Sequence, residues 1–162
     1  MPALTVADTG LGATISGTGL VTTQVVSIGE ALRTKLLSYS AVSTLIGQRM
    51  YPDALVQNAT LPACLYYVTS TERDNHLQGL SKLAHARFTI ECYALTRTTA
   101  SAISRAIRDT GIDAFRGVVS SHTFCGIDFD SGDEYMQEPP TDGNQEHRYI
   151  VSFDMLVHYK EP

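Results

Sequence analysis

The sequence has no excess of basic residues and no long apolar run, and each absence argues against a class of function. Asp and Glu number 17 against 12 Lys and Arg, so the formal net charge is −5. A protein that wraps nucleic acid needs a basic face that releases counterions, although DNA can still pass nearby without being held. No stretch approaches the roughly 20 apolar residues that span a bilayer. Residues 1–8 lack the basic start and the apolar core of a secretory signal.

Cysteine is scarce as well, and Cys64, Cys92 and Cys125 lie far apart in the chain. Their odd number and wide spacing predict neither a disulfide framework nor a zinc site, which needs close pairs of ligands. Each cysteine lies in a predicted strand. We therefore expect small buried side chains in a reducing compartment.

No catalytic motif is present in the sequence. The pattern His-Glu-x-x-His, or any similar metal-ligand spacing, is missing among the histidines, which are His76, His85, His122, His147 and His158. His122 and Cys125 are three residues apart in a predicted strand and would point to opposite faces. The glycines at 10–12 and 17–19 follow no strand and open no apolar helix, so they do not indicate a phosphate loop. We expect no catalytic, cofactor-binding or metal-binding residues, and no enzymatic activity.

The acidic segment 128–134 resembles a calcium-binding loop only superficially. In Asp-Phe-Asp-Ser-Gly-Asp-Glu the glycine comes one position early, and Pro139 stands where the bidentate glutamate of an EF-hand belongs. The segment is better interpreted as an acidic turn in contact with solvent.

Hydrophobic periodicity predicts three helices and four strands. Ser27 and Glu30 have the spacing of a capping box, and Gly47 suits the left-handed position after a helix. The expected elements are helices over 27–38, 41–46 and 98–110, and strands over 63–72, 84–95, 121–129 (with an extension to 136) and 147–159. Their order predicts an α+β fold, with an antiparallel four-stranded sheet and helices packed on one face.

Two regions of this predicted fold indicate contacts with other proteins. The last strand has two mostly apolar faces, which is typical of a central strand or of one whose outer face meets another subunit. Residues 73–83 are long for a simple hairpin turn and are expected to project from the sheet as a loop. Because leucines in such a loop would lie in water, we expect another protein surface to contact Leu77, Leu80 and Leu83.

Residues 1–24 differ from the single α+β domain expected over 25–162. They are rich in Gly and Thr and contain too few apolar residues to build a core. We expect an extended, flexible N-terminal arm that becomes ordered only through contacts outside its own domain core. Its aliphatic side chains, among them Leu4, Leu11 and Ile15, are expected to dock onto a neighbouring subunit. Folding back onto its own domain is the alternative.

Four landmarks over residues 28–159 resemble, in order and spacing, the tail-completion (tail terminator) proteins of long-tailed, siphovirus-type bacteriophages. They are a helix followed by Gly-Gln-Arg-Met-Tyr-Pro at 47–52, Leu61-Pro62 before a strand, the strand 87–94 followed by a helix opened by Thr-Thr-Ala, and the closing strand 149–159. The arm departs from the family pattern. So do Ser40 and Ala41, where an acidic residue is expected.

The resemblance implies a structural virion protein that assembles as a homo-oligomeric ring, usually a hexamer, on the head-proximal end of the tail tube. Such a ring ends polymerisation of the tail tube protein and joins the tail to the head connector or stopper protein. Genomic DNA passes through its lumen without sequence-specific binding, and no membrane is involved. The implied location is the tail or neck of the virion, with the host cytoplasm as the site of assembly.

Within this family, Arg49 and Tyr51 are expected to fix a corner between subunits. The alternative is a surface arginine and a tyrosine that covers the sheet edge. Two other functions also stay open. One is a neck adaptor or stopper ring, and the other is a small α+β ligand-binding domain or enzyme, which a well-formed apolar pocket with convergent polar groups would favour.

Overall fold

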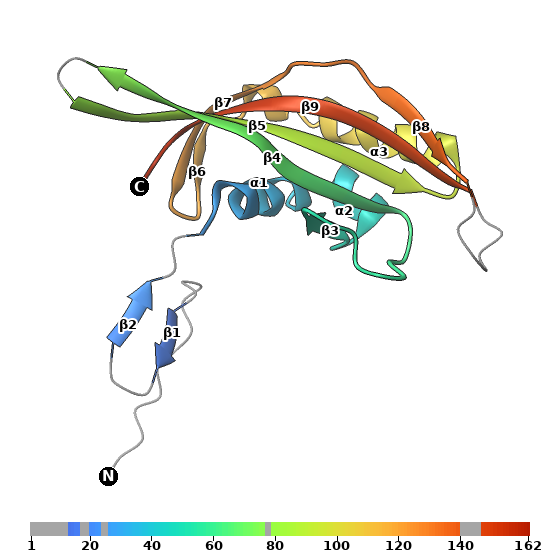
Figure 1. Ribbon diagram of the computed structural model, residues 1–162, viewed down its shortest axis with the longest axis horizontal. Helices are drawn as coiled ribbons and strands as arrows, with labels where there is room; N and C mark the ends of the chain where they lie inside the picture. Colours follow the sequence, from blue (N-terminus) through green and yellow to red (C-terminus); the bar gives the residue numbers. More distant parts are fainter. Residues whose placement is uncertain (1–12, 17–19, 24–25, 77–78, 140–146) are drawn as a thin grey trace, which may run out of the picture.

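The computed structural model describes residues 13–16, 20–23, 26–76, 79–139 and 147–162. Most of these residues form one seven-stranded sheet with α-helices against one of its faces (Figure 1). The predicted α+β class and the packing of helices on one face are confirmed. Within the described part of the chain, no helix is long and apolar enough to cross a membrane.

The four predicted strands pair antiparallel with one another, but the prediction of a sheet of four strands, all antiparallel, is wrong, because the sheet has seven strands and is mixed. The strand order is β3-β4-β5-β9-β7-β6, with β8 also paired to β9, and β3 runs parallel to β4. The extra strands β3, β6 and β8 have three, three and five residues, too few to show a clear alternation. The bounds are β3 Met50–Pro52, β4 Ala63–His76, β5 Gly79–Ala94, β6 Gly117–Val119, β7 His122–Phe129, β8 Glu134–Glu138 and β9 Arg148–Lys160.

The predicted loop over 73–83 is instead the end of a long hairpin. Strands β4 and β5 stay paired as far as His76 and Gly79, which leaves residues 77 and 78 between them. Register shifts after Val68 and after Arg73 interrupt the pairing, and such bulges increase the local twist of a strand. The hairpin extends beyond the helical layer in Figure 1, so the predicted projection is made by strands.

Strand β9 is central, which confirms one of the two interpretations of its apolar faces. It pairs with β5 along nearly its whole length, and on its other side with β7 at one end and β8 at the other. The expected continuation of the third strand to residue 136 is wrong. The chain leaves the pairing with β9 between Phe129 and Glu134, then returns to it as β8.

The three α-helices begin and end within one residue of the predicted bounds. Helix α1 has the capping box of Ser27 and Glu30, and α2 is followed by Gly47 at a φ of 59°. Helix α3 is capped by the Thr96 side chain, which accepts from the N–H of Thr99. The bounds are α1 Ile28–Leu37, α2 Ser40–Ile46, α3 Arg97–Asp109 and the short 3-10 helix η1 Ile112–Ala114.

The core lies between this helical layer and the sheet. The face of β5 that was predicted to be apolar is buried, and Phe88 and Ile90 on it have no exposed surface. Ile103 and Ile107 on α3 are equally buried and belong to the same cluster. At about 25 cal/mol per Å² of apolar surface, burial of each large side chain contributes roughly 1.5–3 kcal/mol.

A second, two-stranded sheet precedes this domain. Strands β1 (Ala13–Ser16) and β2 (Leu20–Thr23) pair with each other in antiparallel register. They belong to no other sheet, and Figure 1 shows them apart from the seven-stranded sheet. The predicted division into an N-terminal arm and one α+β domain stays a prediction, to which the structure adds this hairpin.

Candidate assembly surfaces

The corner at β3 is held together inside one subunit. The Nε of Arg49 donates to the carbonyl oxygen of Pro62 at 2.8 Å. Arg33 on α1 donates to the carbonyl oxygens of Met50 at 2.8 Å and Gln48 at 3.2 Å. Arg49 therefore has an intramolecular partner, and its expected role between subunits stays a prediction.

These bonds also close the outer edge of β3. Pro52 has no N–H, and the N–H of Met50 donates to Gln48 O at 2.9 Å. The carbonyl of Met50 is already bound by Arg33. Tyr51 is half-buried and its backbone lies opposite Leu65 of β4. Because its donors and acceptors are occupied, this edge is protected against the addition of a further strand.

The three leucines predicted to form a contact are not equally placed. Leu83 is 37% exposed, and its register partner on β9 is Lys160. Leu80 lies on β5 opposite Asn75, and Leu77 lies outside the described residues. The contact of these leucines with another subunit or the tail tube stays a prediction. Of the three, only Leu83 supports it, because its side chain is exposed.

The arm residues give less information. Leu4 and Leu11 lie outside the described part of the chain. Ile15 lies on β1, opposite Val21 of β2. Their docking onto a neighbouring subunit therefore stays a prediction, now made for a segment that contains a hairpin.

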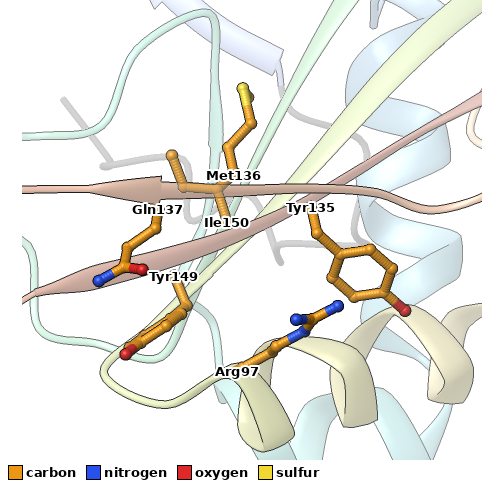
Figure 2. Close-up of a pocket in the computed structure, with 6 residues that line it drawn as sticks. All are labelled: Arg97, Tyr135, Met136, Gln137, Tyr149 and Ile150. Atoms are coloured by element: carbon orange, nitrogen blue, oxygen red, sulfur yellow. The ribbon is translucent and has the colours of Figure 1, made fainter.

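Strand β8 is an exposed sheet edge that the sequence analysis did not single out. Tyr135 is 48% exposed and Met136 is 50% exposed. Figure 2 shows the two side chains on opposite sides of the strand, with Tyr135 pointing toward Arg97. The Arg97 guanidinium lies 4.3 Å from the centre of the Tyr135 ring. A tyrosine and a methionine between Glu134 and Glu138 were the sequence signal for this edge.

A shallow hollow of about 200 Å³ adjoins β8. It is lined by Arg97, Tyr135, Met136, Gln137, Tyr149 and Ile150 (Figure 2). Its lining is part aromatic and part polar, and all five residues of β8 are exposed. Such a surface is suited to a protein contact more than to enclosure of a small ligand, which pockets normally bury by 70–90%.

The sheet face opposite the helices is polar, and carboxylates predominate on it. Strand register places the following acidic residues on this face: Glu72, Asp74, Glu91, Asp128, Asp130, Glu134, Glu138 and Asp154. The basic residues that share it are Arg87, Arg148 and Lys160. The described part of this face therefore carries a net negative charge.

Two tyrosines on this face share one carboxylate. The hydroxyls of Tyr67 and Tyr93 donate to the two oxygens of Glu91 at 3.3 and 2.7 Å. Burial raises the pKa of each phenol, and the adjacent carboxylate of Glu91 raises each pKa further. Both phenols stay protonated at neutral pH and act here as hydrogen-bond donors.

An imidazole pair lies on the same face, near the C-terminal end of β9. Nδ1 of His85 on β5 lies 2.6 Å from Nδ1 of His158 on β9. Nε2 of His85 lies 3.1 Å from Asp74, and Nε2 of His158 lies 2.9 Å from Asp128. The chain of four side chains links β4, β5, β9 and β7.

The acidic turn after β7 binds protein groups. Asp133 accepts from Ser104 at 2.8 Å and from Arg108 at 3.1 Å, both on α3. Asp130 pairs with Arg87, and Asp128 pairs with His158. These carboxylates bind different partners, and Asp133 fixes the segment before β8 to α3. The segment is therefore more than the solvent-facing acidic turn that the sequence predicts.

The cysteines form no disulfide. Sγ of Cys64 and Sγ of Cys92 are 3.7 Å apart, and both thiols are buried, as predicted. The hydrogen bond with Cys64 raises the pKa of Cys92, and burial raises it further, so this thiol is a poor nucleophile. Cys125 is only partly buried, so the expectation of a buried side chain is wrong for this cysteine. Over the described ranges, no group of three metal-binding side chains comes together.

Comparison with known proteins connects this architecture to a family. The family model described as Tail completion protein gp17 matches residues 30–157, from within α1 to within β9. A search of curated proteins finds no match. Among solved structures, a chain in the virion of a native gene transfer agent particle matches at 18% identity and a TM-score of 0.47. The match covers 82% of this chain and 98% of that one.

Because the family model matches most of its length, the chain belongs to the tail completion protein gp17 family. It is a structural protein of a phage tail and is located in the virion. The family resemblance inferred from the sequence is thus confirmed.

Proposed function

We propose that this chain forms a closed homo-oligomeric ring, most simply a hexamer, at the head-proximal end of the tail tube. The observation that carries the proposal is the family match from α1 to β9, which takes in every strand of the seven-stranded sheet. The ring ends polymerisation of the tube protein and joins the tail to the head connector. The protein acts through its surfaces, with no chemistry of its own.

The charge of the sheet supports a role beside passing DNA. Carboxylates outnumber basic side chains on the face opposite the helices, and the whole chain has a formal net charge of −5. A basic lumen would hold the phosphate backbone by ion pairs and slow the passage of the genome. An acidic subunit leaves the DNA free to move.

Tube assembly in the presence and absence of this chain tests the proposal. We expect tube protein alone to give tubes of unregulated length, and tube protein with this chain to give tubes that are capped at one end and no longer extend. A chain carrying Val56→Lys, a change at an exposed loop residue, is the control and should cap normally. Unchanged extension with the native chain would contradict tube termination.

The same preparation separates the proposal from a neck adaptor. Binding of the chain to purified head connectors, without any binding to tube ends, would identify an adaptor or stopper. Binding at tube ends, followed by recruitment of connectors, is the result expected for a terminator.

A further inference from the structure

The seven-stranded sheet has three terminal strands, β3, β6 and β8, and they are not equally free. At β3, the Met50 carbonyl is bound by Arg33 and Pro52 offers no donor. At β8, backbone pairing within the described residues is with β9 alone. The third terminal strand, β6, has only three residues and lies against α1.

Beyond Tyr66 the outer side of β4 has no strand partner among the described residues either. Register shifts after Val68 and Arg73 interrupt this stretch, and Glu72 and Asp74 add charge to it. Strand β8 is therefore the edge best able to accept another strand.

Strand β8 has little of the usual protection of a free edge. Natural edge strands are commonly interrupted by proline, by lysine or by a bulge. Strand β8 has no proline, lysine or bulge, and its two charged residues, Glu134 and Glu138, stand at its ends. Between them it exposes Tyr135 and Met136, one on each side. A strand added beside it would gain main-chain hydrogen bonds and would cover both side chains.

The N-terminal hairpin would be stabilised by pairing with a further strand. Strands β1 and β2 pair only with each other in the described sheets, and an isolated two-stranded hairpin is marginally stable in water. Their sequences, Ala-Thr-Ile-Ser and Leu-Val-Thr-Thr, are rich in β-branched residues and carry no charge. They can therefore approach Glu134 and Glu138 without charge repulsion.

The hairpin is poorly placed to reach β8 of its own chain. Residues 24–27 join β2 to α1, and the five peptide steps from Thr23 to Ile28 reach at most about 17 Å. Figure 1 shows the hairpin and β8 at opposite ends of the molecule. The β8 edge of a second copy has no such restriction.

We propose that the β1–β2 hairpin of one subunit adds to the β8 edge of the next subunit and extends its sheet. The contact is head-to-tail, because donor and acceptor are different surfaces, and repetition of such a contact closes a ring when the rotation permits. This inference rests on the proposed ring and names the surfaces that join its subunits.

A mixing experiment tests the contact directly. The full chain with Met136→Lys keeps the donor hairpin and loses the acceptor edge. A chain that starts at Val25 keeps the acceptor and loses the donor. Each alone should remain monomeric under conditions where the native chain assembles, and the mixture should give a one-to-one heterodimer. The full chain with Val56→Lys, whose exposure of 54% matches the 50% of Met136, should assemble normally.

Hydrogen exchange locates the contact. In the native assembly, amides of residues 134–138 that point outward should exchange roughly tenfold more slowly than in the monomer. Assembly that leaves these amides unprotected, or rings formed by the chain starting at Val25, would overturn the inference and leave the proposed ring intact. Failure of the native chain to assemble, with or without tail tubes, would contradict the proposed function and this inference with it.

Discussion

The rings of His85 and His158 meet edge to face across β5 and β9, at an interplanar angle of 78° and with their Nδ1 atoms 2.6 Å apart. Two nitrogens at this distance can share one proton, since one must donate and the other accept. Each outer nitrogen lies within hydrogen-bond distance of a carboxylate, Asp74 or Asp128. The pair therefore joins four strands of the sheet through side chains.

This geometry predicts that the two histidines stabilise the fold jointly. We expect His85→Ala and His158→Ala each to lower the free energy of unfolding by about 1–2 kcal/mol, because each leaves polar partners unmatched. The double variant should cost less than the sum, with a coupling of roughly 0.5–2 kcal/mol. Urea denaturation of the four proteins measures this cycle, and strict additivity would show that the two rings do not interact.

The hydrogen bond of Arg49 at the β3 corner predicts that loss of this side chain destabilises the monomer. Arg49→Met removes the bond to the Pro62 carbonyl, and we expect a loss of about 1–3 kcal/mol. Arg105→Met, at an exposed position on α3, is the matched control and should stay within roughly 0.5 kcal/mol of the native chain. A normal unfolding curve for Arg49→Met, combined with defective assembly, would instead favour the intersubunit role.

Thiol labelling should distinguish the three cysteines. Cys64 and Cys92 are fully buried, and the pKa of Cys92 is raised, whereas Cys125 is only partly buried. We expect a thiol reagent at pH 8 to label Cys125 first and the other two only at the rate of unfolding. Cys125→Ser should remove the early phase. An early phase that survives this substitution would show that the Cys64–Cys92 pair opens in the native state.

His122 predicts a dependence of stability on pH. It is 5% exposed on β7, and burial lowers its pKa below the ordinary value. The unfolded chain therefore binds a proton more readily, so its contribution to stability is complete above about pH 6.5 and is lost as the pH falls below that value. The melting temperature should fall less between pH 7 and 5 for His122→Gln than for the native chain. His147→Gln, at an exposed position, is the control and should leave that fall unchanged.

The sequence predicted the long elements of the fold well because their signals are local. The capping box at Ser27, the glycine after α2 and the alternation along β5 each involve neighbours in the chain. Strands of three residues carry no such signal, and β3 exists because Arg33 and Arg49 bind its corner from elsewhere in the chain. The family landmarks were readable for the same reason, as they are short stretches in a fixed order.

The candidate surfaces were harder to predict because they depend on register. His85 and His158 meet only because β5 and β9 pair with these residues opposite each other, 73 positions apart. The open edge at β8 follows from the break after Phe129, where the turn is bound to α3 through Asp133. Neither relationship is visible in periodicity alone.

The central claim is that this chain closes into a ring at the end of a tail tube. The most direct measurement is electron microscopy of the full native chain mixed with purified tubes, with averaging of the capped ends viewed along the tube axis. We expect rings with six-fold symmetry, each of six copies of the 17.6 kDa chain, at one end of every tube. Single copies at tube ends, binding along the tube wall, or no binding at all would contradict the claim.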